Sequence, residues 1–333
     1  MAKRTAALAL THALVDFTCA LLLFSRVGAA WLPAALVYNF CAFALQLPLG
    51  ALCDRRHDPV RTAAAGCALA AFACFLPAAP AAVLAGVGNA LFHVGGGVHV
   101  LRGSRRAGPL GVFVAPGAAG IFFGTRLGKS GGLPVWAAAL ACALGGAALL
   151  LASRTWDAPP RTAGPGSGGK ADAPAAGNAL ACAACLFPVV ALRAYVGLCQ
   201  RFPWKDACAL PLLAALILGK ALGGLLCDRL GARRTALFTL LPAAALFLLP
   251  ARPLAGVSAV LLFNMTMPVT LHLLARRLPG EEGFAFGLLT LALFAGYYPV
   301  QLGLGVPLGG VWLALASLAS LALLLGALRE KRA

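Results

Sequence analysis

The phrase Gly50-Ala-Leu-Cys-Asp54-Arg55 returns almost unchanged as Gly224-Leu-Leu-Cys-Asp228-Arg229. Each copy closes a long apolar run, at the point where a membrane helix would meet water. The copies also fall at equivalent places, each at the end of the second apolar run in its part of the chain. This repeat indicates that the chain consists of two related halves, an architecture typical of transporters with a central site.

The composition places both halves in a membrane. The chain has 333 residues, of which 61% are hydrophobic and 11% charged, and its mean hydropathy is +0.88. Soluble domains carry roughly 25% charged residues, so a soluble enzyme, a secreted disulfide scaffold and a disordered protein are excluded. The apolar runs are continuous, whereas the strands of an outer-membrane barrel would alternate in polarity.

Twelve apolar runs are long enough to cross a bilayer as helices of about 20 residues. Six are expected in the first half, at 6–24, 31–53, 61–78, 81–101, 108–125 and 133–152. Six more are expected in the second half, at 178–199, 207–227, 234–250, 253–275, 282–303 and 308–328. The sequence therefore predicts an all-α membrane protein with 12 transmembrane helices in two pseudo-symmetric six-helix bundles.

A segment rich in Pro, Gly and Ser separates the two sets of runs. This composition is typical of a flexible linker without a core of its own. The predicted domains are an N-terminal bundle at 1–152, a cytoplasmic linker at 153–177 and a C-terminal bundle at 178–333.

The charges between the runs predict the orientation. Most of the 27 Lys and Arg residues fall on the cytoplasmic side if the N-terminus is cytoplasmic, as the positive-inside rule requires. We expect a multi-pass protein of the cytoplasmic (inner) membrane with both termini in the cytoplasm. The net charge of +17 does not indicate nucleic-acid binding, because no basic stretch is interleaved with aromatic residues.

The repeated phrase resembles the loop motif G-x-L-x-D-R-x-G-R-R of the major facilitator superfamily. The fuller copy has Gly224, Leu226, Asp228, Arg229, Gly231, Arg233 and Arg234. The first copy has Gly50, Leu52, Asp54 and Arg55, but His57 stands where the family has Gly. The resemblance implies a secondary transporter of the 12-helix bacterial type that works by alternating access, usually as a monomer.

The acids of this motif are expected to form a gate. A carboxylate at a helix end can pair with loop arginines and with the positive N-terminal end of a neighbouring helix. The predicted gating residues are Gly50, Asp54, Arg55, Gly224, Asp228, Arg229, Arg233 and Arg234. The alternative is that these Asp-Arg pairs only anchor helix ends at the interface.

Ionisable side chains inside the runs are candidates for function, because a charge near the bilayer centre costs about 2.5–3.5 kcal/mol. Asp16 is the only acid well inside a run, and His12 precedes it by one helical turn. A carboxylate and an imidazole at this spacing share a helix face and can exchange a proton at physiological pH. We expect proton coupling at His12 and Asp16, with a packing pair as the alternative.

Other polar residues fall near the middle of the runs in both halves. The predicted substrate-binding residues are Asn39, Asn89, His93, Arg193, Lys220, Asn264 and Tyr297. Convergence from both halves is what a central cavity needs. Two buried cations, Arg193 and Lys220, favour a small organic substrate that carries negative charge.

Two other functions compete with this interpretation. The segment 111–120 is a loose match to a Gly-Pro-rich motif of drug-exporting antiporters, which makes a drug or metabolite efflux antiporter an alternative. An intramembrane enzyme acting on lipid is the alternative from another class, but the sequence has neither HExxH nor GxSxG. We expect no enzyme activity, cofactor or metal, and the partners are a small-molecule substrate, H+ and the lipid bilayer.

Overall fold

Helices account for every named element in the part of the chain that this computed structural model describes, which is residues 2–26, 31–55, 58–156 and 176–329. A backbone inside a bilayer must satisfy its own N–H and C=O groups, and a helix does so within one segment. The chain divides into two compact units. Unit 1 comprises Met1–Arg105, Val112–Arg161 and Glu281–Leu291, and unit 2 comprises Arg106–Gly111, Thr162–Gly280 and Ala292–Ala333.

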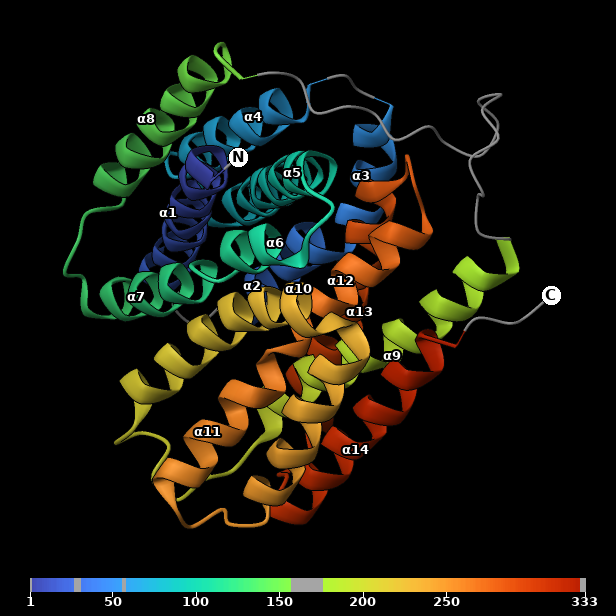
Figure 1. Ribbon diagram of the computed structural model, residues 1–333. Helices are drawn as coiled ribbons and strands as arrows, with labels where there is room; N and C mark the ends of the chain where they lie inside the picture. Colours follow the sequence, from blue (N-terminus) through green and yellow to red (C-terminus); the bar gives the residue numbers. More distant parts are fainter. Residues whose placement is uncertain (1, 27–30, 56–57, 157–175, 330–333) are drawn as a thin grey trace, which may run out of the picture. The chain divides into compact units, whose positions relative to one another are not determined.

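Unit 1 holds the helices of the first half of the sequence. They are α1 (Ala2–Arg26), α2 (Trp31–Asn39), the π-helix η1 (Phe40–Ala44), α3 (Gln46–Asp54), α4 (Pro59–Ala73), α5 (Ala78–Gly103), α7 (Gly117–Ser130) and α8 (Val135–Ser153). In Figure 1, α1 runs beside α7, and α4 runs beside α5. The core between these helices contains large buried side chains such as Leu8, Leu21, Phe92 and Phe113.

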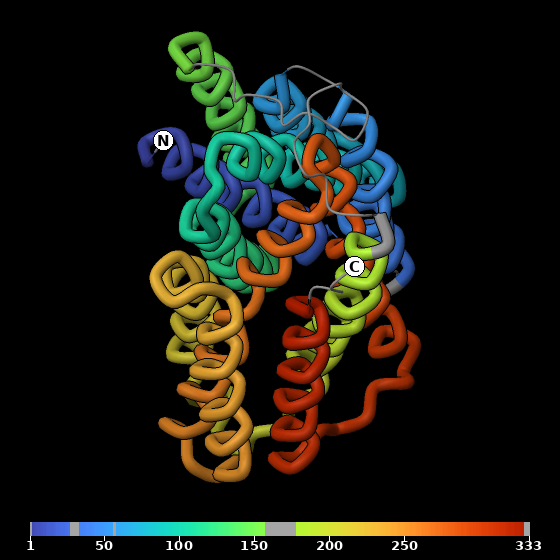
Figure 2. The backbone as a smooth tube through the Cα atoms, turned by 45° about the vertical axis from the view of Figure 1, so that its right-hand side comes forward, coloured from blue at the N-terminus to red at the C-terminus, as the bar shows by residue number. Residues whose placement is uncertain are grey.

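Unit 2 holds most of the second half. Its helices are α9 (Ala176–Cys199), α10 (Ala209–Phe247), α11 (Pro253–Asn264), α12 (Thr266–Arg277), the π-helix η2 (Val300–Leu304) and α14 (Gly310–Ala327). Figure 2 shows α14 beside α9, and α10 also packs against α11 and α14. The buried side chains Leu240, Phe247 and Leu313 form part of this core.

Two helices are shared between the units. The first residues of α6 (Ala107–Val114) belong to unit 2 and its last residues to unit 1. The first residues of α13 (Glu282–Pro299) belong to unit 1, and its remainder belongs to unit 2. The predicted domain boundaries at 152 and 178 stay predictions, and residues 157–175 of the predicted linker lie outside the described residues.

Ten helices in the described residues are long and apolar enough to cross a membrane. One of them, α10, has 39 residues and contains Gly231 at φ 78° and ψ 160°, a conformation that glycine adopts far more readily than other residues. Two of the expected runs therefore meet at this kink. The run expected at 61–78 forms α4, which has only 15 residues. Because α10 covers two expected runs and α4 is short, ten candidate spans are found where twelve runs are expected. The number of twelve spans stays a prediction.

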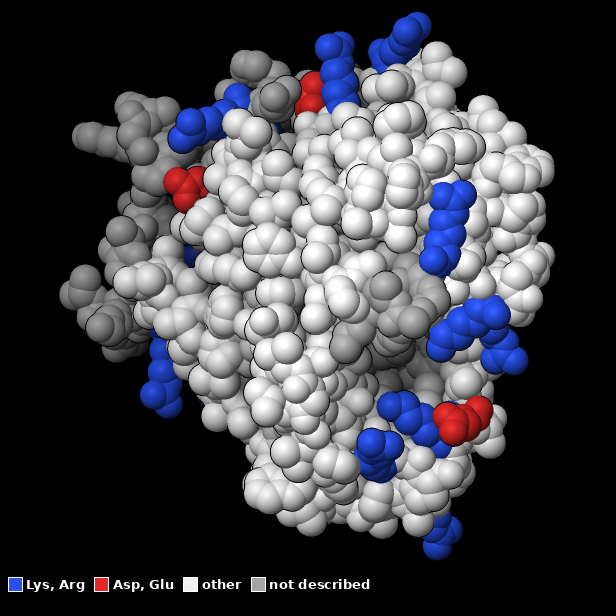
Figure 3. Space-filling view, turned by 180° about the vertical axis from the view of Figure 1, so that it is seen from behind, with Lys and Arg blue, Asp and Glu red and all other residues white. Residues whose placement is uncertain are grey.

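The surface agrees with a lipid environment. Leu254 is 81% exposed, Leu10 74% and Leu180 73%. Figure 3 shows a face that is largely uncharged, on which Lys and Arg side chains lie singly or in small groups. Large exposed apolar areas of this kind mark contact with a membrane or a partner rather than with water.

Close packing of α4 on α5 depends on glycine. A Cβ atom on Gly88 would lie 2.7 Å from the backbone N of Ala70 and 2.8 Å from the carbonyl O of Gly66. Gly88→Ala must therefore push the helices apart, and overpacking of this kind costs about 1–3 kcal/mol. We expect a lower thermal unfolding midpoint for the purified variant in detergent.

Gly197→Ala is the matched control, because a Cβ atom on Gly197 in α9 would meet nothing within 4 Å. An alanine is about 1 kcal/mol better than glycine inside a helix, so this control should unfold at the wild-type temperature or above it. Equal midpoints for the two variants would contradict the packing argument.

Candidate functional site

Four polar side chains meet inside unit 1. His12 and Asp16 lie one turn apart on α1, and Asn89 and His93 lie one turn apart on α5. The Nε2 atom of His12 is 3.2 Å from Oδ2 of Asp16 and 2.7 Å from Nε2 of His93. Asn89 donates from Nδ2 to Oδ1 of Asp16 at 2.8 Å. We call these four residues the histidine–aspartate cluster.

Aromatic rings and a close helix start surround the cluster. The rings of Phe92 and Phe113 have centroids 6.0 and 5.1 Å from that of His12. Gly117, at the start of α7, brings its backbone so close that a Cβ atom there would lie 2.5 Å from both Oδ2 of Asp16 and Nε2 of His12. His12 and Asp16 are both buried, which strengthens the electrostatic interactions between the cluster members.

Backbone carbonyls fix the tautomers of both histidines. His12 Nδ1 is 2.7 Å from the carbonyl O of Phe113, and His93 Nδ1 is 2.9 Å from that of Asn89. A carbonyl oxygen only accepts a hydrogen bond, so each Nδ1 carries the hydrogen. Phe113 lies in the last turn of α6, where carbonyl groups lack partners within the helix.

This assignment leaves the two Nε2 atoms facing each other. In neutral rings both Nε2 atoms carry a lone pair, and two lone pairs 2.7 Å apart repel each other. One additional proton turns the contact into a hydrogen bond between an imidazolium and an imidazole. The Asp16 carboxylate beside them balances the added positive charge. The arrangement therefore has the geometry of a site for a single proton.

The same atoms are of a kind that could ligate a metal ion. The ligand atoms of His12, Asp16 and His93 lie within 4.8 Å of one another. Two nitrogens bound to one tetrahedral zinc at ~2.0–2.1 Å would lie about 3.4 Å apart. The observed separation of 2.7 Å is shorter, so the geometry fits a proton better than a zinc ion.

The first copy of the repeated motif makes a second polar constellation in unit 1. Asp54, the last residue of α3, accepts hydrogen bonds from the backbone N of Gly283 and of Phe284 at 2.8 Å each. These amides belong to the first turn of α13. Arg102 donates from Nη2 to Asp54 at 3.1 Å and pairs through Nε with Glu282 at 3.2 Å.

The second copy makes an equivalent constellation in unit 2. Asp228 on α10 accepts hydrogen bonds from the backbone N of Ala107 at 2.6 Å and of Gly108 at 2.9 Å, at the start of α6. Arg106 lies 3.5 Å from Asp228 through its Nε atom. Each motif carboxylate therefore sits at the positive N-terminal end of a helix.

The other predicted gating residues take different places. Gly50 packs against the backbone of Gly283, and Gly224 packs against the backbone of Ala107 and Gly108. The motif arginines lie exposed at the ends of α3 and within α10: Arg55, Arg229, Arg233 and Arg234. The ion pairs described above come instead from Arg102 and Arg106.

The predicted substrate-binding residues are divided between the two units. Asn89 and His93 belong to the histidine–aspartate cluster. Asn39 and Asn264 donate to carbonyls of their own helices, Ala35 at 2.7 Å and Val260 at 2.8 Å. Half-buried side chains are found at Lys220 in α10 and at Tyr297 in α13.

Arg193 on α9 is the remaining member of that set. Its side chain is 8% exposed, and its Nη1 atom has no hydrogen-bond partner among the described residues. A buried guanidinium without a full set of partners is costly. This costly group is the best candidate in unit 2 for contact with a ligand.

Three groups in the histidine–aspartate cluster and the Asp54 constellation are not predicted as site residues by the sequence. Arg102 follows the expected run at 81–101 and Glu282 begins the expected run at 282–303, and the structure shows both buried and paired with each other. Glu282 is one of only ten acids in the chain, and that scarcity was the available signal. The carbonyl of Phe113 carries no signal in the sequence, because a backbone group is common to every residue.

Comparison with known proteins identifies the fold. No family model matches the chain, and no curated protein matches it in sequence. The E. coli fucose:proton symporter FucP, a major facilitator superfamily transporter, is 13% identical over 99% of each chain, with a TM-score of 0.70. The human organic anion transporter MFSD10 is 15% identical over 97% of this chain and 99% of its own, with a TM-score of 0.64. A bacterial homologue of the iron transporter ferroportin is 14% identical over 97% of each chain, with a TM-score of 0.63.

These similarities extend over almost the whole length of each chain. At such low sequence identity they establish the fold alone. The chain is a multi-pass membrane protein with the fold of the major facilitator superfamily, which confirms the resemblance inferred from the repeated motif. The similar structures are transporters rather than enzymes.

The Asp54 constellation predicts a stability effect. Asp54→Asn removes the negative charge that faces Arg102, and removing one partner of a buried ion pair costs about 3–5 kcal/mol. The remaining pair with Glu282 should reduce this cost. We expect a clearly lower thermal unfolding midpoint than for the wild type.

The control is Asp206→Asn, because Asp206 lies exposed in the turn before α10, and exposed charges contribute about 0–1 kcal/mol. If Asp54→Asn unfolded at the same temperature as this control, the buried ion pair would not stabilise the protein.

Proposed function

We propose that this chain is a secondary active transporter that moves a small anionic solute and is coupled to protons through the histidine–aspartate cluster. The fold supports the first part, because the similar solved structures are transporters. One of them is named a proton symporter and another an organic anion transporter. Those names describe the other proteins, and the support for coupling and substrate class comes from this chain's own residues.

The single observation that carries the coupling proposal is the contact between the two imidazoles. Both Nδ1 atoms face backbone carbonyls, and the two Nε2 atoms lie 2.7 Å apart beside the Asp16 carboxylate. With one proton bound between the rings, the cluster is neutral overall and its close contacts are attractive. Without that proton, the lone pairs repel and Asp16 loses its cationic partner.

This difference links protonation to helix position. His12 lies on α1 and also holds the carbonyl at the end of α6, whereas His93 lies on α5. Loss of the proton therefore favours separation of α1 from α5 at the contact between His12 and His93. A transporter that binds a proton in one state and releases it in another needs such a two-state contact.

Arg193 supports an anionic substrate. A charged group inside a membrane protein faces a cavity, a partner or a substrate, because hydrocarbon does not solvate it. A carboxylate or phosphate on the solute would satisfy the guanidinium with strong, charge-assisted hydrogen bonds. A neutral solute would leave the positive charge of Arg193 unbalanced.

Asp54 and Asp228 are the proposed gate. Each holds two backbone amides at a helix N-terminus through its carboxylate oxygens. These bonds are short and directional, so a movement of either helix weakens or breaks them. We propose that they break and re-form as access to the substrate site alternates, and that both lie on the cytoplasmic side together with the two chain termini.

Replacement of the cluster histidines should uncouple transport. We expect proteoliposomes with an imposed pH gradient to accumulate at least one anion from a panel of radiolabelled carboxylates and sugar phosphates. His93→Gln and His12→Gln should reduce gradient-driven accumulation at least tenfold, because no proton can be shared between two rings. Exchange of labelled for unlabelled solute, which needs no net proton movement, should persist.

His272→Gln is the matched control, since His272 is a half-buried histidine on α12, outside the cluster. It should accumulate solute like the wild type. Undiminished accumulation by His93→Gln and His12→Gln would refute proton coupling at this cluster. A wild type that transports no member of the panel would refute anion transport within these classes.

Arg193 should determine the charge of the substrate. Arg193→Gln should abolish both accumulation and exchange of the transported anion, and Arg193→Lys should retain part of the exchange because it keeps the charge. Arg201→Gln, at an exposed arginine, should match the wild type. The anion assignment fails if the wild type and Arg193→Gln exchange the anion at equal rates.

A further inference from the structure

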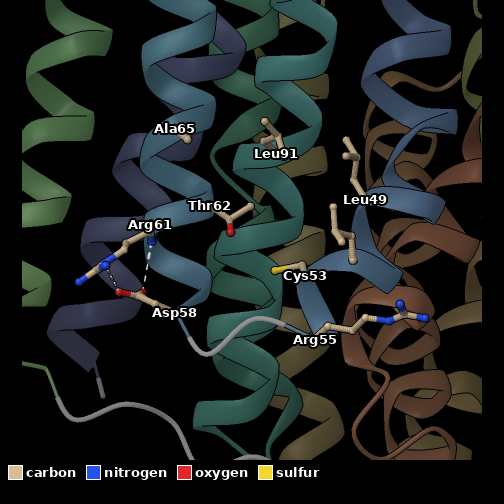
Figure 4. Close-up of a pocket in the computed structure, with 9 residues that line it drawn as sticks. Leu49, Cys53, Arg55, Asp58, Arg61, Thr62, Ala65 and Leu91 are labelled. Carbon is tan, nitrogen blue, oxygen red and sulfur yellow. Dashed lines mark hydrogen bonds and ion pairs between the residues drawn. The ribbon is translucent and has the colours of Figure 1, made fainter.

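A cavity of 590 Å³ opens between α3, α4 and α5 of unit 1, separate from the histidine–aspartate cluster. Figure 4 shows it at the place where α3 ends and α4 begins. Leu49, Leu52 and Leu91 form apolar walls, together with Ala65. We call this cavity the α3–α4 groove.

The walls of the groove suit an acyl chain. Leu52 is 48% exposed although it lies in a helix that is part of a candidate membrane span. An open apolar space between membrane helices is lined by hydrocarbon side chains, which offer no hydrogen-bond partners to water. The volume lies within the range of cavities that bury a small organic ligand, about 300–1,000 Å³.

The mouth of the groove is basic. Arg55 follows the last residue of α3, and Arg61 lies in the first turn of α4. In Figure 4 their side chains extend to opposite sides of the groove. A groove with apolar walls and basic side chains at one end has the chemistry that binds an anionic lipid head group.

The acid at the mouth is already neutralised. Asp58 caps α4 by accepting from the backbone N of Val60 at 3.1 Å and of Arg61 at 3.2 Å through Oδ1. Its Oδ2 atom pairs with Nε of Arg61 at 2.9 Å. Because both oxygens of Asp58 are occupied, the charge of Arg55 is not cancelled by it. The mouth therefore carries net positive charge.

We propose that the α3–α4 groove binds one phospholipid with an anionic head group. Its phosphate contacts Arg55, Arg61 adds positive charge on the other side of the mouth, and an acyl chain lies between Leu49, Leu52 and Leu91. A free phosphate would make no use of the apolar walls. A choline head group would place a further positive charge beside the two arginines. This site does not depend on which solute the protein transports.

A lipid at this position would affect the gate formed by Asp54. Arg55 is the neighbour of Asp54, whose carboxylate holds the first amides of α13. A lipid phosphate on Arg55 and an acyl chain along α3 would hold the end of this helix in place. Bound lipid should therefore favour the state in which the Asp54 contacts are formed.

Native mass spectrometry of the delipidated full-length protein tests the proposal. The probes are dioleoylphosphatidylglycerol, dioleoylphosphatidylethanolamine and dioleoylphosphatidylcholine, each added at the same concentration, with glycerol 3-phosphate as the head group alone. We expect one retained phosphatidylglycerol molecule, bound at least fivefold more tightly than phosphatidylcholine. Glycerol 3-phosphate should not bind.

Two variants separate the head group from the chain. Arg55→Ala combined with Arg61→Ala should lower phosphatidylglycerol retention at least fivefold, and Ala65→Trp should do the same by filling the groove while leaving both arginines. Arg154→Ala, at an exposed arginine at the end of α8, should retain the lipid like the wild type. Size-exclusion profiles confirm that each variant is folded.

The proposal is overturned by either of two results. One is equal retention of phosphatidylglycerol by the wild type and by both groove variants, which would place the lipid elsewhere. The other is equal or tighter retention of phosphatidylethanolamine or phosphatidylcholine, which would show that the arginines do not select an anionic head group.

Discussion

The hydrocarbon core of a membrane does not solvate charge, and this constraint governs the buried polar groups of the protein. A buried carboxylate, imidazole or guanidinium must find its partners inside the chain or on a ligand. Asp16 finds them in His12, His93 and Asn89. Asp54 and Asp228 find them in the first amides of helices, which also satisfies donors that a helix leaves without partners. The packing of the helices therefore supplies the partners that the buried polar groups need.

The same constraint separates structural from functional groups. Arg102 is buried but paired with two acids, Asp54 and Glu282, so it needs no ligand. Arg193 is equally buried, yet one of its nitrogen atoms has no partner among the residues described. In the sequence, Arg193 lies inside an apolar run and Arg102 lies just after one, but only the surroundings in the fold show which of them has its partners within the chain. For this reason, Arg102 is the structural partner of Asp54, and Arg193 is the residue proposed to contact the substrate.

Small residues make the close contacts possible. Gly88 lets α5 approach α4, and Gly117 lets the start of α7 reach the side chains of His12 and Asp16. An ion pair or shared proton in a dry interior needs short distances, because its strength falls with separation. The abundance of glycine, with 39 residues, is therefore connected to the chemistry as well as to the fold.

The sequence by itself determined the membrane class, the positions of the apolar runs and the resemblance to the major facilitator superfamily, because these depend on local composition and on a repeated phrase. It also placed His12 beside Asp16 and Asn89 beside His93, since residues four apart share a helix face. Only the tertiary structure joined these two pairs into one cluster and brought the Phe113 carbonyl to His12. The contacts of α1 with α5 and α6 that do so cannot be predicted from the sequence of any one helix. Likewise, the sequence offered Arg55 and Arg229 as partners of the motif acids, whereas Arg102 and Arg106 lie near enough to pair with them. Residues that are far apart along the chain become partners only when the fold brings them together, and their spacing in the sequence does not show this.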